Sequence, residues 1–448
     1  MAAPLSVFLT TFNTGLQGSS AQEQDLSSWL VPGLHNAELA PYGATPDIFA
    51  VAVQELLPLH LAFSGLSGPV LNTLSQRMEN ILSQHATSLS KDGSPDTYHV
   101  VAKIAHVGVA LWVFARDATT AGRLGRPETS SVGLWRFGLG NKAAVGVRLP
   151  VQRGANGGGW ETLTFVSTHL EAHDHNIGLR NEQYEKILSS LIFTPQDGSH
   201  QRLQPFHTSH LFIMGDLNYR LSRLPRSTSP GQENAEGRDA VKLQKERADC
   251  VAFDTLKKEQ SMGRAFGYLR EGDLTGFAPT YKRIPNEVEG YSKKRIPGWT
   301  DRIFFSSHTD PVELYEPNTP AYLAPATTTQ IIQFDSSPEV VFSDHKPVHA
   351  VLILPPVQHN AQSPQVAPVI PAPPANKYRV RPQAIPEDQR RREAIIGTIL
   401  DRLIGFPWLI IVILGLGNVK HGAGVAAFLT LMYNLYRYGI FGGGGGGA

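Results

Sequence analysis

The feature that most constrains the fold is a long alternation of short apolar runs and amphipathic segments, from residue 5 to about residue 354. Many strands with fewer helices predict an α/β sandwich. The predicted strands cover residues 5–10, 48–53, 99–104, 107–115, 143–149, 163–168, 211–214, 301–306 and 349–354. The predicted helices cover residues 68–88, 178–191 and 239–259.

The composition changes at residue 355. From 355 to 386 the chain is dense in Pro, Ala, Gln and Val and has no usable period, which predicts a semi-extended linker. We divide the chain into a folded domain (1–355), a Pro-rich linker with a basic end (356–393), a hydrophobic region (394–441) and a Gly tail (442–448).

The hydrophobic region contains two apolar runs, residues 406–417 and 422–441. As a helix, the first run is too short to cross a hydrocarbon core of about 30 Å, whereas the second is long enough if Arg437 reaches the interface. A hairpin, one span preceded by an interfacial helix, and two helices packed on the folded domain all fit this pattern. We expect a membrane attachment, because a long linker precedes the runs and few charges break them. The arginines at 390–392 favour a cytosolic N-terminal side.

Charge and cysteine content restrict the function classes. Lys and Arg number 40 and Asp and Glu number 39, so no strong basicity argues for a nucleic-acid partner. The single cysteine, Cys250, excludes an internal disulfide framework and a Cys-rich zinc site. It fits a reducing compartment such as the cytosol.

Several polar residues follow predicted strands directly, where the active sites of α/β proteins form. Glu55 has the carboxylate that a hard divalent cation prefers. His169 has a ring N–H for a phosphoryl oxygen. Asp216 offers a carboxylate that binds or deprotonates water, and Asn218 offers an amide donor. Each also has an ordinary explanation: a solvated Glu, an incidental surface His, or a simple turn.

A late Asp-His pair completes this set. His345 follows Asp344 on a turn before the last predicted strand, and Asp301 begins an earlier strand. A carboxylate such as Asp301 is able to orient the His345 imidazole for proton transfer.

In this order and spacing the blocks resemble the endonuclease/exonuclease/phosphatase superfamily over nearly all of residues 5 to 354. The residues that carry the resemblance are Asn13, Glu55, His169, Gly215-Asp216-x-Asn218, Asp301 and Ser343-Asp344-His345. The resemblance implies a four-layer α/β/β/α sandwich, here followed by C-terminal hydrophobic helices.

Two blocks are similar to signatures of the inositol polyphosphate 5-phosphatase branch. They are Gly215-Asp216-Leu217-Asn218-Tyr219-Arg220 and Arg295-Ile296-Pro297-Gly298-Trp299-Thr300-Asp301-Arg302-Ile303. Further agreement comes from Gly140-Asn141-Lys142, Arg180-Asn181 and Tyr281-Lys282. Departures from common family residues at Phe12, Gly298, Ala143-Ala144 and Arg283 remove no catalytic group, but they leave fine substrate preference open.

The resemblance implies a role for each of these residues. Glu55 and Asn13 would hold Mg²⁺, with Asp344 as a second metal-site carboxylate. Asp216 would orient or deprotonate water, and Asp301 would fix His345. The implied phosphate donors are His169, Asn218 and His345. The implied substrate-binding residues are Asn141, Lys142, Arg180, Asn181, Tyr219, Arg220, Tyr281, Lys282, Lys294, Arg295 and Arg302.

The implied reaction is Mg²⁺-dependent removal of a 5-phosphate from phosphatidylinositol 4,5-bisphosphate or a related phosphoinositide at a membrane. The arrangement is similar to small fungal 5-phosphatases with a C-terminal anchor on the endoplasmic reticulum, whose catalytic domain would face the cytosol. The alternatives are a superfamily nuclease, a sphingomyelinase-like phosphodiesterase, and an inert membrane adaptor that only binds phosphoinositide. The near-neutral charge disfavours the nuclease, and Glu55, Asp216 and His345 together disfavour the adaptor.

Overall fold

The structure is a computed structural model. It describes residues 4–16, 23–32, 45–90, 93–153, 159–195, 199–225, 240–315, 325, 327–356, 367–372, 381–416 and 418–437.

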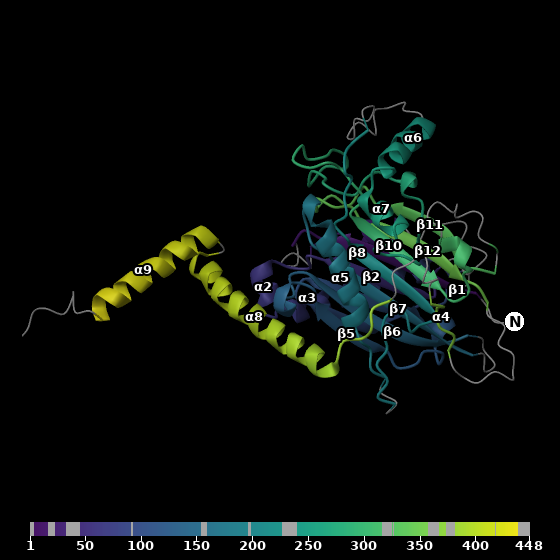
Figure 1. The fold of residues 1–448 in the computed structure, drawn as a ribbon, viewed down its shortest axis with the longest axis horizontal. Coiled ribbons are helices and arrows are strands. Elements are labelled where there is room, and N and C mark those ends of the chain that lie inside the picture. Colours follow the sequence, from purple (N-terminus) through teal and green to yellow (C-terminus); the bar gives the residue numbers. More distant parts are fainter. Residues whose placement is uncertain are drawn as a thin grey trace, which may run out of the picture.

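This part of the chain contains two mixed β-sheets packed face to face (Figure 1). The strands of sheet A are β1 (Leu5–Asn13), β2 (Ile48–Gln54), β3 (Tyr98–His106), β4 (Val109–Arg116), β11 (Gln330–Ser336) and β12 (Val348–Leu354). The strands of sheet B are β5 (Glu128–Gly133), β6 (Ala143–Gln152), β7 (Trp160–His169), β8 (His210–Asp216), β9 (Arg270–Glu271) and β10 (Asp301–Ser307). Their orders are β11-β12-β1-β2-β4-β3 and β5-β6-β7-β8-β10-β9.

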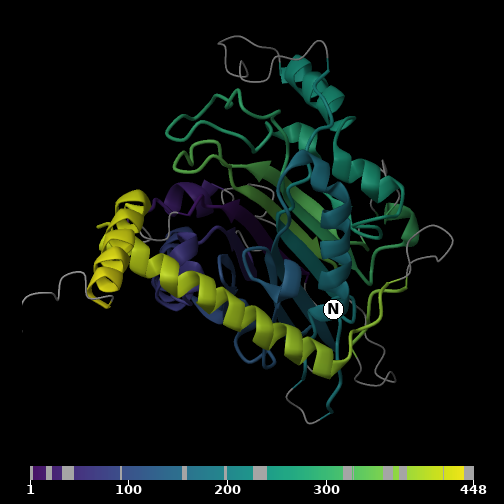
Figure 2. The same ribbon diagram turned by 60° about the vertical axis from the view of Figure 1, so that its left-hand side comes forward.

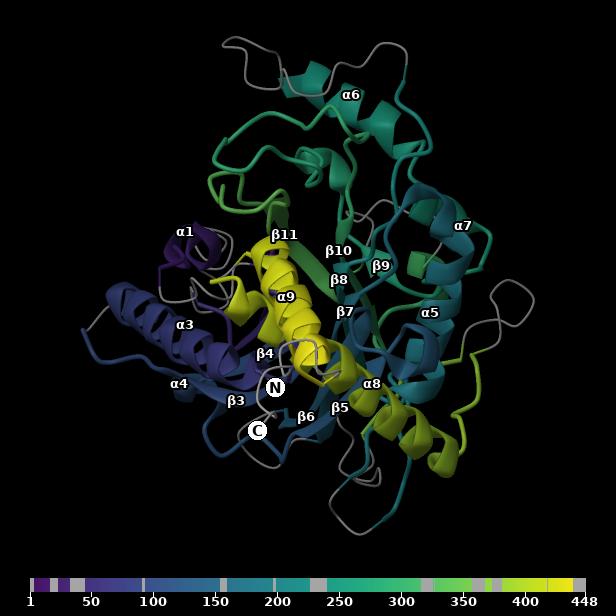
Figure 3. The same cartoon turned by 90° about the vertical axis from the view of Figure 1, so that its left-hand side faces the viewer.

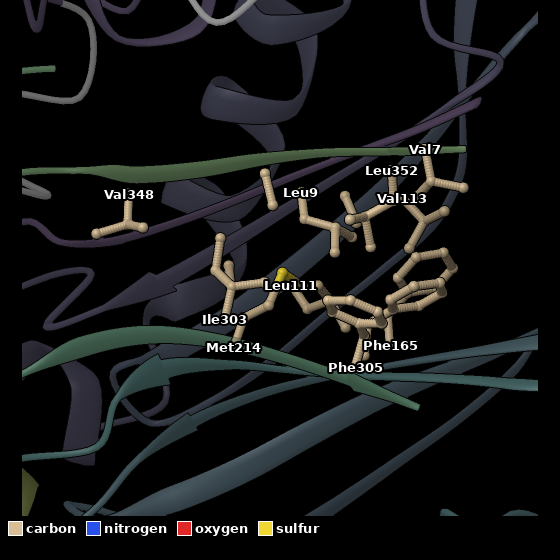
Figure 4. Close-up of a cluster of buried hydrophobic side chains, with 14 of the residues drawn as sticks. Val7, Leu9, Leu111, Val113, Phe165, Met214, Ile303, Phe305, Val348 and Leu352 are labelled. Atoms are coloured by element: carbon tan, nitrogen blue, oxygen red, sulfur yellow. The ribbon is translucent and has the colours of Figure 1, made fainter. Parts of the chain in front are cut away.

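The main core lies between the two sheets (Figure 4). Val7 and Leu9 point into it from sheet A, and Met214 and Phe305 point into it from sheet B. Alternate residues such as Phe8 point to the outer face of sheet A, where helices cover them. Because both faces of the central strands are buried, these strands appear in the sequence as nearly continuous apolar runs.

Helices cover the outer face of each sheet. The helices on sheet A are α1 (Ser27–Leu30), α2 (Leu59–Phe63) and α3 (Ser67–Leu89), and the short α4 (Asp117–Thr120) follows β4. The helices on the side of sheet B are α5 (Ile177–Ser190) and α7 (Thr255–Ser261), whereas α6 (Ala240–Val251) contributes Cys250 to the core between the sheets. The four-layer α/β/β/α sandwich is therefore confirmed.

The nine predicted strands are present, with ends that shift by a few residues. The prediction of one helix over 239–259 is wrong, because Asp254 ends that continuity: its side chain accepts a hydrogen bond from the Lys257 amide and caps a new helix. Strands β5, β9 and β11 were not predicted. They are short or edge strands that lack a continuous apolar run.

Two helices follow at the C-terminus, α8 (Glu387–Leu414) and α9 (Val419–Arg437). Among the described helices, α8 is long and apolar enough to cross a membrane, by length and composition alone. The first apolar run, expected to be too short by itself, is the C-terminal part of α8, which continues toward the N-terminus through residues 387–405. That the second run is long enough to span stays a prediction, because the last residues of that run are not described. The Gly tail and residues 438–441 lie outside the described residues.

Helix α8 runs along the folded domain, and α9 turns away from it (Figure 2). The buried residues of α8 are Gly397, Asp401 and Gly405, which share one helix face. The described parts of the linker also contact the domain: Ile370 N donates to Thr208 O at 2.8 Å, and Ile385 N donates to Ser189 O at 3.0 Å.

Candidate active site

Strand register brings the predicted catalytic residues to one end of the sandwich. In sheet B, His169 pairs with Asp216, and Asp216 pairs with Asp301. In sheet A, Asn13 ends β1 beside Gln54 of the parallel strand β2. Gly215 permits the close approach of β7 and β8, since a Cβ there would lie 1.8 Å from the Thr168 carbonyl oxygen.

Asp216 is the centre of this group and is 1% exposed. One carboxylate oxygen, Oδ2, accepts from Asn13 Nδ2 at 3.0 Å and lies 3.3 Å from His169 Nε2 and 3.9 Å from His345 Nε2. The other oxygen accepts from the Asn218 amide at 3.0 Å. Burial alone would raise the pKa of Asp216, but the hydrogen bond with His169 and the charges of His345 and Lys142 hold this pKa below its usual range. Asp216 is therefore an ionised carboxylate, and both of its oxygens accept hydrogen bonds.

His345 and Asp301 form a buried ion pair, with Nδ1 2.9 Å from the Asp301 Oδ2 atom. The Thr280 and Thr300 hydroxyls also donate to this oxygen, at 2.7 and 3.0 Å. Burial alone would lower the pKa of His345, but the Asp301 charge and hydrogen bond raise the pKa to about 10. His345 is thus a cation at neutral pH, whose Nε2–H faces Asp216. The two threonines were not predicted, although each stands within a recognised block.

Lys142 contacts the other histidine, with Nζ 2.6 Å from His169 Nε2. Burial lowers the pKa of Lys142. Because Nε2 cannot accept from Lys142 and donate to Asp216 at the same time, the two contacts compete for one ring nitrogen. An anion between Lys142 and His169 would give each group a better partner.

The oxygen ligands for a hard cation lie on the rim of this group. Asn13 already contacts Asp216, and Glu55 follows β2 in the left-handed conformation (φ 52°) and is half-buried. Asn141 Oδ1 is buried without a hydrogen-bond partner among the described residues. A set of carboxylate and amide oxygens with an unsatisfied acceptor fits magnesium or calcium. Asp344 is less available to bind a metal ion, because its Oδ2 lies 2.5 Å from Lys282 Nζ.

One predicted substrate residue, Tyr281, contacts His345, and two others, Arg220 and Lys282, lie over the Tyr281 ring. The Tyr281 ring lies 4.5 Å from the His345 ring, between centroids, and the Arg220 guanidinium lies 4.7 Å from the Tyr281 centroid. Arg220 Nη2 donates to Asn218 Oδ1 at 3.0 Å, while Nη1 is buried with no hydrogen-bond partner in the described part of the chain. Tyr281, Lys282 and Arg220 thus form a cationic wall beside Asp216.

Other predicted substrate residues make contacts within the protein. Tyr219 Oη donates to Asn181 Oδ1 at 2.5 Å, and Arg180 Nη1 donates to the His173 carbonyl at 2.7 Å. Arg302 is 0% exposed and ion-paired with Asp254 at 2.9 Å and with Glu271. Because these ion pairs hold the Arg302 side chain in the protein interior, the structure does not bring it to the site. Lys294 and Arg295 are exposed on the loop before β10.

A second buried acid–imidazole group lies at the opposite end of sheet B. Glu161 lies 3.1 Å from His210 Nε2 and 3.0 Å from His308 Nε2. These are potential metal ligands by type and proximity. However, Arg153 Nη1 lies 2.5 Å from the same carboxylate and supplies a positive charge there. Because this ion pair already neutralises the Glu161 charge, the group attracts a metal cation only weakly.

The model for Endonuclease/Exonuclease/phosphatase family 2 matches residues 10–351. This chain belongs to that family. Polyphosphatidylinositol phosphatase INP53 of Saccharomyces cerevisiae is 26% identical over 353 residues, which are 77% of this chain and 26% of that protein. The type II inositol 1,4,5-trisphosphate 5-phosphatase of Mus musculus is 27% identical over 349 residues, 77% of this chain and 29% of that protein. The chain thus spans only a quarter to a third of these relatives.

The fold also matches solved structures. The inositol polyphosphate 5-phosphatase domain of SpSynaptojanin, solved with inositol (1,4)-bisphosphate and calcium ion, aligns with a TM-score of 0.56 and 22% identity, over 79% of this chain and 85% of that one. A Cimex nitrophorin aligns with a TM-score of 0.51 and 20% identity, over 79% of this chain and all of the other. Fold alone therefore does not identify the reaction, which depends on the side chains of the site.

Proposed function

We propose that this family member is a Mg²⁺-dependent 5-phosphatase that acts on phosphatidylinositol 4,5-bisphosphate or a related phosphoinositide. One observation carries the proposal: Asp216 is hydrogen-bonded to Asn13 and lies within 4 Å of His169 and of His345, which is itself paired with Asp301. An ionised acceptor and two imidazoles thus converge where a phosphate and a water molecule would meet.

The residues divide the work of hydrolysis. Asp216 accepts a hydrogen bond from the attacking water and thereby directs a lone pair of the water oxygen toward phosphorus. Its low pKa suits orientation more than proton storage. His345, held as a cation by Asp301, donates through Nε2–H to a phosphoryl oxygen. The water oxygen forms the new P–O bond as the ester P–O bond breaks. One proton of the water ends on the leaving inositol oxygen and the other stays with the phosphate, so that the products are inorganic phosphate and a free inositol hydroxyl.

Glu55 and Asn13 would hold the magnesium ion, with Asp344 as a further carboxylate. When bound, the ion polarises phosphoryl oxygens and offsets the negative charge of the leaving oxygen. Lys142 and His169, which contact each other through Nζ and Nε2, would both turn to the scissile phosphate.

Substrate class is supported by the cationic wall. Arg220 and Lys282 flank Tyr281, and a guanidinium with an unpaired nitrogen binds phosphate well. Lys294 and Arg295 are exposed nearby in sequence and remain our candidates for the phosphate adjacent to the one removed. Relatives whose names give a 5-phosphatase activity on inositol 1,4,5-trisphosphate or phosphatidylinositol 3,4,5-trisphosphate support the same choice over the nuclease.

A phosphate-release panel tests the proposal. With Mg²⁺, the full-length protein should release phosphate from bisphosphorylated phosphoinositides in vesicles and from soluble inositol trisphosphate, and EDTA should abolish this. A single-stranded DNA control should stay intact. Cleavage of the nucleic acid without release from any inositol phosphate would reject the proposal in favour of a nuclease.

We also infer that α8 attaches the protein to a membrane, and by resemblance we place it on the endoplasmic reticulum with the site facing the cytosol. The outer face of α8 is apolar: Ile399 is 53% exposed, Leu403 64% and Phe406 50%. Such a helix is able to bury one face in the bilayer interface while the other contacts protein. Replacing these three residues by Glu should release the protein from floating vesicles, whereas Thr398→Glu on the same helix should not. Unchanged flotation of the triple variant would contradict this attachment.

A further inference from the structure

Helix α8 does more than lie beside the domain: one of its charged side chains holds a loop of the active site. The loop is residues 138–142, which ends in Lys142, the contact of His169. Asp401 is 2% exposed, and its Oδ1 accepts a hydrogen bond from the Gly140 amide at 3.1 Å. This hydrogen bond joins the C-terminal helix to the site, although the two residues are 261 positions apart in the sequence.

The contact between helix and loop is unusually close. A Cβ on Gly397 would lie 2.2 Å from the Gly138 carbonyl oxygen, and a Cβ on Gly140 would lie 2.3 Å from the Val107 side chain. Glycine at these positions lets the α8 backbone, the loop and β-sheet A meet without space between them. The loop is therefore clamped between the helix and Val107.

Neighbouring contacts fix α8 along its length. Arg402 Nη1 donates to the Phe63 carbonyl oxygen at 2.6 Å, just after the residue that binds the loop. Toward the N-terminus Lys186 lies 3.3 Å from Glu393, and toward the C-terminus the Trp408 ring lies 6.1 Å from the His60 ring. Two adjacent charged residues in the middle of an apolar helix thus each have a backbone partner on the folded domain. Figure 3, which looks from the α8 and α9 side, shows both helices in front of the sandwich.

We propose that Asp401 is a positioning residue for the reaction, which holds Gly140-Asn141-Lys142 so that Lys142 meets His169 and the substrate phosphate. The anchor helix is then a wall of the active site and not a detachable tether. This inference rests on the proposed phosphatase function for its kinetic test, but its structural test does not.

The mechanism is hydrogen-bond satisfaction of a buried amide. Without the Asp401 carboxylate the buried Gly140 N–H loses its acceptor, and an unsatisfied buried donor has a free-energy cost. The loop relieves that cost by moving, and a shift of about 1 Å in a positioning group is able to reduce turnover by about 100-fold. An Asn at 401 keeps an acceptor oxygen in the same place and should preserve the loop.

The kinetic test uses full-length protein in detergent with soluble inositol trisphosphate, so that vesicle binding plays no part. We expect Asp401→Leu to lower kcat at least tenfold, Asp401→Asn to retain most of it, and Thr398→Ala, at an exposed position of the same helix, to match the wild type. In a Lys142→Met background, Asp401→Leu should have little further effect. Full kcat in Asp401→Leu, or an undiminished effect of Asp401→Leu in the Lys142→Met background, would overturn the proposal.

Hydrogen exchange gives the structural test, which stands even if no inositol phosphate is cleaved. The peptide containing Gly140 should exchange faster in Asp401→Leu than in Asp401→Asn or wild type, at equal global stability. If Asp401→Leu does not fold, Gly397→Ala displaces the same loop more gently and should show the same two changes. Equal exchange in all folded variants would reject the positioning role. Absence of phosphate release by the wild type, with the expected exchange pattern, would reject the proposed reaction alone.

Discussion

The two ends of sheet B contain the same types of side chain but differ in how their charges are balanced. One end has Asp216, Asp301 and His345, and the other has Glu161, His210 and His308, each a buried group of carboxylate and imidazole. At the first end His345 is raised in pKa to about 10 and a cluster of amide and carboxylate oxygens lies nearby. At the second, Arg153 already balances Glu161. Charge balance with the neighbours, more than the kind of side chain, separates a reactive site from a structural one.

The Glu161 end has a clear structural role. Arg153 also donates to the carbonyl oxygen of Pro355 at 2.8 Å, and His210 Nδ1 lies 2.9 Å from the Ser307 hydroxyl. Burial alone would raise the pKa of Glu161, but His210, His308 and Arg153 hold it below its usual range. The group thus ties the end of the last strand to sheet B.

The largest expected effect that sharpens this comparison is at Asp216. Asp216→Asn should reduce phosphate release by on the order of 10⁴-fold or more, because the neutral amide cannot orient water or balance His345. Its near-UV circular dichroism should stay native. Turnover close to wild type would contradict the assigned role.

The matched change at the opposite end is Glu161→Gln. It leaves Arg153 buried without a charge partner, so the free energy of unfolding should fall by about 3–5 kcal/mol. Urea denaturation measures this loss. Activity per folded molecule should remain, and a selective loss of kcat at unchanged stability would show that the two ends are not functionally distinct.

The pH dependence of stability should also separate the two ends. The folded pKa of His345, about 10, lies above its ordinary value of 6.5. Its stabilising contribution is therefore complete below pH 6.5 and is lost as pH rises toward 10. Urea denaturation in EDTA should show this decline in wild type and a flatter profile in His345→Gln. Parallel profiles would contradict the charged His345.

The smallest expected effect is on substrate preference. Lys294→Ala with Arg295→Ala should reduce the preference for substrates with a 4-phosphate by about tenfold, as the loss of one or two exposed phosphate contacts predicts. The ratio of kcat/KM values with and without that phosphate measures it. Lys293→Ala, on the same exposed run, serves as the control. An unchanged ratio in the double variant would reject this assignment.

Much of the fold and of the central site could be predicted from the sequence, because a polar residue directly after an apolar run indicates the end of a buried strand. Asp216 and His169 are examples, since both follow apolar runs and the parallel pairing of β7 and β8 places them side by side. That a residue belongs to a motif does not predict the direction of its side chain. Arg302 stands within a recognised block, yet Asp254 and Glu271 enclose it.

The C-terminal helix shows the other limit of sequence analysis. The charged pair Asp401-Arg402 was not singled out from the sequence, because nothing in its local pattern indicates a backbone partner 261 residues away for Asp401 or 339 residues away for Arg402. Only the tertiary contacts show that both charged residues dock α8 on the folded domain.

The most direct test of the central claim is the position of the phosphate that is removed. Phosphorus NMR of the product from inositol 1,4,5-trisphosphate, with Mg²⁺ and wild-type protein, should show inositol 1,4-bisphosphate and inorganic phosphate, and Asp216→Asn should leave the substrate intact. Release of the 1- or 4-phosphate, or an equal product yield from Asp216→Asn, would contradict the account.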